Sequence, residues 1–163
     1  VAKGAIVRVA PGLYSLPERE PAQDDELAEV IRKVEGGLIC LLSAAAFHDL
    51  TTTVPNRIWL AVERGRRRPS LRHPPLRVVS MSAASFQFGR QVVPVGGINV
   101  AMTDVEKTIA DCFKFRTSVG METCLEALKS YLDRPVRSPD RLLEAASVCR
   151  VEAVLAPYVE ALL

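Results

Sequence analysis

The order of periodic patterns along the chain most constrains its fold, because strand-like segments come first and helix-like segments follow. Before Thr103, short segments have the apolar or alternating composition of β-strands, and after it apolar residues recur at helical spacing. This order predicts an α+β fold, a small antiparallel sheet followed by helices. The expected strands are residues 57–63, 77–81, 91–95 and 98–102, the last two a hairpin around Gly96 and Gly97, and the expected helices lie within 105–113, 121–132, 138–146 and 151–163.

Hydroxyl side chains predict where three of the helices begin. Thr103 and Glu106 have the spacing of a capping box for the helix that starts at residue 105. Ser138, followed by Pro139 in the first turn, is expected to open a later helix. Ser43 is expected to cap a short helix rich in small residues.

The first residues of the chain form a second predicted unit. Alternating segments on either side of Pro11 and Gly12 predict a β-hairpin, and we expect a loose loop or a bulge there because a type II turn splays the strands of a tight hairpin. A hairpin alone is marginal in water, so it must pack on something else. We therefore expect residues 1–17 to form the hairpin, 18–25 a polar linker, and 26–163 the α+β domain with a helical C-terminal part.

Composition restricts the kinds of partner and the setting. Lysine and arginine together number 21 against 19 aspartates and glutamates, so any contact with nucleic acid must be local rather than a property of the whole surface. The four cysteines are scattered among aliphatic residues, which predicts buried free thiols and a reducing cytoplasm. No stretch is long and apolar enough to predict a membrane-spanning helix.

One segment has an unusual charge, the run RGRRRPSLRHPPLR at residues 64–77. Arginine forks suit phosphate oxygens, and the prolines prevent a regular element between the two flanking strands. The segment has no aromatic residue on which unpaired bases could stack, which favours phosphate contacts over base recognition. Three interpretations remain open: contact with DNA or RNA, contact with an acidic protein surface, and a solvated hairpin tip. The candidate binding residues are Arg64, Arg66, Arg67, Arg68 and Arg72.

Two pairs of neighbouring polar residues could suggest catalysis. His48 and Asp49 would need further ligands to hold a metal, and the only other histidine lies in the arginine-rich segment. Glu106 and Lys107 are adjacent on an expected helix, whereas a metal-dependent nuclease needs them two apart on a strand. The sequence therefore predicts no catalytic residue, no cofactor and no metal site.

Three short segments, in order, carry a family resemblance: GLYSLP, SAAAFHDLTTTVP and TDVEKTIADCF. With the segments between them, they resemble the AbiEi family of bacterial antitoxins and transcriptional regulators over roughly residues 5 to 115. The resemblance implies a winged helix-turn-helix that binds operator DNA, followed by a larger domain that counters a nucleotidyltransferase-like toxin. It also implies that residues 4–17 are the wing, that Arg8 contacts phosphate there, and that the other helices of the module precede Val1.

Two functions are therefore expected as alternatives. The first is the antitoxin of a type IV toxin–antitoxin system, a non-enzymatic cytoplasmic protein that regulates its own transcription by binding duplex DNA. The second is a small nucleic-acid-processing enzyme that grips phosphate through the segment from Arg64 to Arg77.

Overall fold

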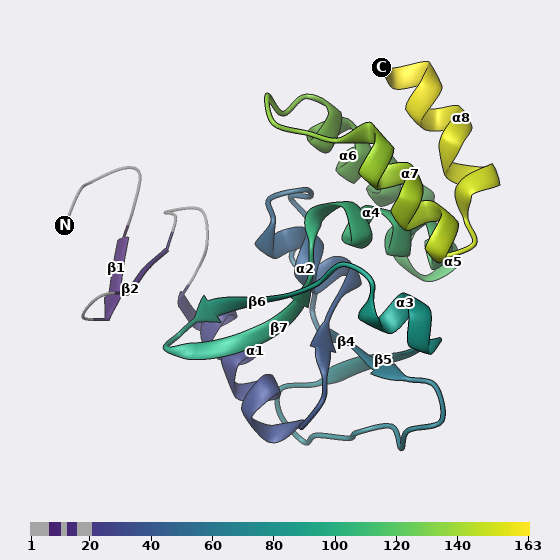
Figure 1. Ribbon diagram of the computed structural model, residues 1–163. Helices are drawn as coiled ribbons and strands as arrows, with labels where there is room; N and C mark the ends of the chain where they lie inside the picture. Colours follow the sequence, from purple (N-terminus) through teal and green to yellow (C-terminus); the bar gives the residue numbers. More distant parts are fainter. Residues whose placement is uncertain (1–6, 11–12, 16–20) are drawn as a thin grey trace.

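A five-stranded mixed sheet forms the centre of the molecule (Figure 1). The structure is a computed structural model that describes residues 7–10, 13–15 and 21–163. The strands lie in the order β5-β4-β3-β7-β6. Their bounds are β3 Leu38–Ile39, β4 Ile58–Glu63, β5 Leu76–Met81, β6 Arg90–Val95 and β7 Ile98–Thr103.

The sheet is mixed rather than antiparallel, which corrects one part of the prediction. β3 pairs antiparallel with β4, and β6 with β7, but the pairs β4·β5 and β3·β7 are parallel. The two-residue strand β3 sits in the middle of the sheet between two strands that are distant from each other in sequence. The α+β class is confirmed, and so is the β6–β7 hairpin, whose turn residues Gly96 and Gly97 both have positive φ.

Helices cover both faces of the sheet, and strand β4 is accordingly buried on both. Its apolar run is buried throughout, with Trp59 and Ala61 in one hydrophobic cluster and Ile58 and Leu60 in the other. The helix α1, Pro21–Lys33, supplies Leu27 and Val30 to the second cluster, and Val34, the residue after the helix, also belongs to it. The helices that follow the sheet supply most of the first cluster. A strand buried on both faces is expected to be continuously apolar, as β4 is.

The helices after β7 form the layer that Figure 1 shows on the opposite side of the sheet from α1. The central one, α4, contacts α2, α6 and α7. All four cysteines are buried as free thiols, as predicted. The remaining helices are α2 Leu41–Phe47, α3 Ala83–Gln87, α4 Val105–Lys114, α5 Arg116–Val119, α6 Met121–Leu132, α7 Pro139–Val148 and α8 Glu152–Leu162.

Two of the three predicted helix caps are wrong. The cap of α4 is Asp104, whose Oδ1 accepts a hydrogen bond of 2.9 Å from the backbone N–H of Lys107. Thr103 belongs to β7 and lies one residue too early for that role. Ser43 lies inside α2, where its Oγ accepts from the backbone N–H of Trp59 at 2.9 Å. The cap at Ser138 is confirmed, since its Oγ accepts from the N–H of Arg141.

The N-terminal hairpin is present as a separate two-stranded antiparallel sheet. It consists of β1, Val7–Ala10, and β2, Leu13–Ser15, with the expected irregularity of register between Arg8 and Ala10. Its turn and the first part of the predicted linker lie outside the described residues. α1 begins at Pro21, so residues 21–25 are helical and not part of a linker.

Candidate nucleic-acid interface

The arginine-rich segment connects two parallel strands, and this determines its path. We call residues 64–75, between β4 and β5, the arginine loop. Because β4 and β5 run in the same direction, the loop must return from the end of β4 to the start of β5. It is therefore a crossover beside the edge strand of the sheet and not a hairpin tip (Figure 1).

The loop is attached to the domain near its middle and near its end. Leu71 packs against the hydrophobic cluster beneath α1, and Pro74 is buried. On α1, the Nζ of Lys33 donates to the backbone carbonyl of His73 at 3.3 Å, while it also pairs with Glu29 at 2.7 Å. These contacts fix the path of the loop across the surface.

Arg68 attaches the first half of the loop to the free edge of β5. Odd-numbered carbonyls of β5 face β4, as the bond from Arg64 N–H to Met81 O shows, so the carbonyl of Val78 faces outward. Arg68 Nη1 donates to Val78 O at 2.8 Å, and its Nη2 lies 3.4 Å from Ser80 Oγ. A basic side chain thus occupies an edge carbonyl that another strand could otherwise pair with.

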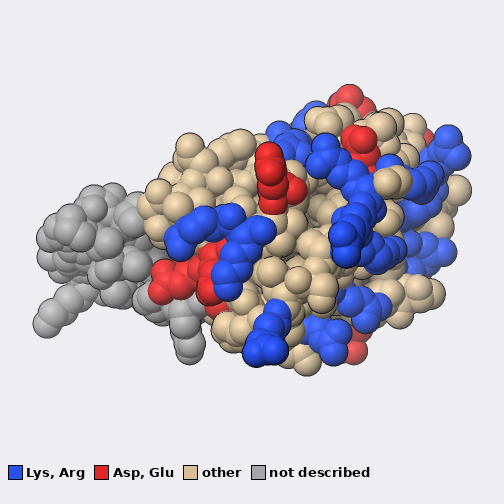
Figure 2. Space-filling model, turned by 90° about the horizontal axis from the view of Figure 1, so that it is seen from below, with Lys and Arg blue, Asp and Glu red and all other residues tan. Residues whose placement is uncertain are grey.

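Three of the five candidate arginines in the loop point their charge to solvent without a protein partner. Arg64, Arg67 and Arg72 are exposed, and none of their guanidinium groups forms a hydrogen bond or ion pair with a described residue. Arg66 is also exposed and lies over the turn after α1, where a Cβ added to Gly36 would meet Arg66 Nη1 at 3.1 Å. Lysine and arginine side chains recur across this part of the molecule in Figure 2, seen from below.

The remaining arginines of the sequence prediction lie elsewhere. Arg77 is in β5. Its guanidinium lies 5.3 Å from the ring centroid of Trp59, and its Nη2 lies 3.4 Å from Ser118 Oγ, so it packs on the face of the sheet that the helices after β7 cover. Arg8 lies in β1, opposite Tyr14 in the two-stranded sheet. The structure therefore brings Arg64, Arg66, Arg67, Arg68 and Arg72 together on one loop and has Arg8 in the other sheet.

The two polar pairs considered for catalysis have structural contacts. His48 ends α2, and its Nε2 lies 2.8 Å from the carbonyl of Thr103. Glu106 accepts a hydrogen bond of 2.5 Å from the hydroxyl of Tyr131. Lys107 is buried and forms an ion pair of 2.7 Å with Asp111. Among the described residues no three histidine, cysteine or acidic side chains converge as metal ligands would.

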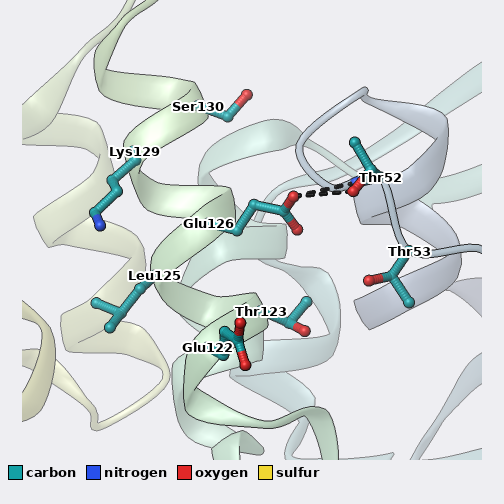
Figure 3. A pocket seen from close by; sticks show the side chains of 8 residues that line it. All are labelled: Thr52, Thr53, Glu122, Thr123, Leu125, Glu126, Lys129 and Ser130. Atoms are coloured by element: carbon teal, nitrogen blue, oxygen red, sulfur yellow. Dashed lines mark hydrogen bonds between the residues drawn. The ribbon is translucent and has the colours of Figure 1, made fainter.

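An open groove of about 790 Å³ lies where the loop after α2 meets α6 (Figure 3). Glu126 accepts from Thr51 Oγ1 at 2.5 Å and from Thr52 Oγ1 at 3.1 Å, and these bonds lower the pKa of its carboxyl. Thr52 and Thr53 line the groove on one side, and Ser130 on the other. The carboxylate of Glu126 is engaged in joining two elements, which is a structural role.

Sequence comparison adds no further identification. No protein-family model matches the chain, and no curated protein matches it. Nor does any helix of the described segments have the length and apolar character needed to cross a membrane.

Proposed function

We propose that this chain belongs to an antitoxin and transcriptional regulator of the AbiEi type, and that its arginine loop contacts the phosphates of duplex DNA. The observation that carries the proposal is the exposure of Arg64, Arg67 and Arg72 on an anchored loop without a carboxylate partner. Guanidinium groups placed in this way gain their partners only from outside the domain.

The anchoring of the loop favours binding. Leu71 and the contact from Lys33 hold the loop along a defined path, so less conformational entropy is lost when a ligand binds. Arginines repeated along such a path suit a uniform polyanion such as the DNA backbone, where each finds a phosphate whatever the sequence. The loop would add its phosphate contacts to the one that the family resemblance implies for Arg8.

A direct test compares the affinities of two charge-matched variants for duplex DNA. Replacing Arg64, Arg67 and Arg72 together by glutamine should weaken binding of a labelled duplex of about 20 base pairs by about tenfold or more at low salt. The control replaces Lys114, Lys129 and Arg137 by glutamine, so it changes the net charge by the same amount. These residues lie on the C-terminal helices and their connections. Fluorescence anisotropy should show near-unchanged affinity for the control. Equal losses in both variants would contradict a specific role of the loop.

The antitoxin part of the proposal has a separate test in cells. If a nucleotidyltransferase-like toxin is encoded beside this protein, a strain that expresses that toxin should regain growth when the protein is co-expressed. The variant with Arg64, Arg67 and Arg72 replaced should restore growth as well as the wild type does, because the loop contacts DNA. If growth rescue is lost while DNA affinity survives, the loop instead binds a protein partner and its assignment to DNA is wrong.

A further inference from the structure

A groove of about 450 Å³ lies beside the α6–α7 connection, away from the arginine loop. It is bounded by the end of α2, the start of β6, the N-terminus of α4 and the α6–α7 loop, residues 133–138. Phe47, Val93 and Val105 give it apolar walls, and Val136 stands at its rim with 87% of its surface exposed. This is the most exposed of the large hydrophobic side chains in the described part of the chain.

The loop that carries Val136 is held in one conformation. Tyr131, which is buried, accepts a hydrogen bond of 2.6 Å from the backbone N–H of Ser138 and donates one to Glu106. The guanidinium of Arg134 donates to the carbonyl of His48, and Arg137 donates to the carbonyl of Arg134 at 2.8 Å. Both ends of the loop are thereby tied to neighbouring helices, so Val136 is presented to solvent at low entropic cost to a binding partner.

Positive charge flanks Val136 at the rim of the groove, from Arg134 and Arg137. Of the two carboxylates in the lining, Asp104 pairs with Arg141 at 3.0 Å, and Glu106 accepts a hydrogen bond from the hydroxyl of Tyr131. Arg134 and Arg137, on either side of Val136, form no ion pair with any carboxylate in the described segments. The complementary partner therefore has carboxylates that flank an apolar side chain.

We infer that this groove, with Val136 at its rim, is a docking surface for a protein segment in which acidic residues flank an aliphatic or aromatic side chain. The apolar side chain enters between Val93, Val105 and Val136, and the carboxylates pair with Arg134 and Arg137. A nucleic acid is less suitable, because a phosphate backbone gains nothing from an exposed valine. The inference is independent of DNA binding by the arginine loop, since the two surfaces share no residue.

The experiment uses a random 12-residue peptide library displayed on phage and selected against the full chain. Enriched peptides should combine acidic residues with an apolar one. Their affinities, measured by fluorescence polarisation, should fall about tenfold or more in Val136→Ser and in Arg137→Glu. Both positions are exposed, so circular dichroism should show unchanged folding.

Two matched controls separate this surface from the rest of the molecule. Val54→Ser changes another exposed valine, and Arg67→Glu reverses a charge in the arginine loop. Neither should alter the affinity of the enriched peptides. The inference is overturned if no peptide is enriched, if binding is insensitive to Val136→Ser, or if Arg67→Glu weakens it as much as Arg137→Glu does. It is also overturned if Val136→Ser and Arg137→Glu weaken the binding of duplex DNA as much as they weaken the binding of the peptides, because the groove would then serve nucleic acid.

Discussion

Lys107 and Asp111 form a buried ion pair inside the first hydrophobic cluster, where the thiol of Cys149 also donates to Asp111 at 3.3 Å. Burial raises the pKa of Asp111, and the charge of Lys107 opposes that effect. The two residues are four apart on α4, a spacing visible in the sequence. Their burial was not predictable, because it depends on how α7 and β5 close over α4.

Removing one partner of this pair should be costly. Lys107→Met leaves the Asp111 carboxylate buried without its cation, and we expect a loss of about 3–5 kcal/mol in the free energy of unfolding at neutral pH. The loss should be smaller in acid, because the lone buried carboxyl then takes up a proton. The double variant Lys107→Met with Asp111→Leu should recover most of it in urea unfolding. If Lys107→Met unfolds with the same free energy as the wild type, the ion pair contributes nothing to stability.

Tyr131 gives a prediction about alkaline pH. Burial, together with its hydrogen bond to Glu106, raises the pKa of Tyr131 to about 12, against 10.0 for an ordinary tyrosine. The unfolded chain therefore releases this proton first, so its contribution to stability is complete below pH 10 and is lost as the pH rises towards 12. Tyr131→Phe should cost about 1–2 kcal/mol at neutral pH, since Ser138 N–H and Glu106 lose their partner. The stability difference between wild type and variant should narrow above pH 10, and a constant difference would contradict this reasoning.

At the scale of elements, local pattern predicted the four longer strands of the sheet and most helices after it, but not the short elements β3, α3 and α5, nor how the strands pair. The hairpin β6–β7 and the helices after it follow from glycine positions and apolar spacing. The parallel pairing of β4 with β5 could not be predicted, because neither strand has a signal for its direction. The role of Arg68 depends on that pairing, since it binds the edge that the strand order leaves free.

Arg68 and Arg67 should therefore differ in their effect on self-association, although they are neighbours and both are exposed. Arg68→Gln removes the donor to Val78 O and uncovers the edge of β5, so light scattering should detect association that increases with protein concentration. Arg67→Gln should remain as dispersed as the wild type. If the two variants behave alike, Arg68 does not protect the sheet edge.

At the scale of the whole molecule, the structure separates two surfaces with different chemistry. The arginine loop connects β4 to the edge strand β5, whereas the groove at Val136 is lined by residues of α2, β6, α4, α6 and the α6–α7 loop. Composition indicated that any contact with nucleic acid had to be local, and the arginine run at residues 64–72 indicated its place in the sequence. The groove could not be predicted from sequence, because it combines residues from separate elements and has at its rim one valine in a proline-containing loop.

The central claim is that the arginine loop makes phosphate contacts, and the salt dependence of DNA affinity measures such contacts directly. For the wild-type protein, log Kd for duplex DNA should rise linearly with the logarithm of the salt concentration. Each lost phosphate contact should lower the slope by about 0.9, so replacing Arg64, Arg67 and Arg72 by glutamine should lower it by about 2 to 3. The control with Lys114, Lys129 and Arg137 replaced should keep the wild-type slope. An unchanged slope in the loop variant, even with weaker binding, would contradict the claim.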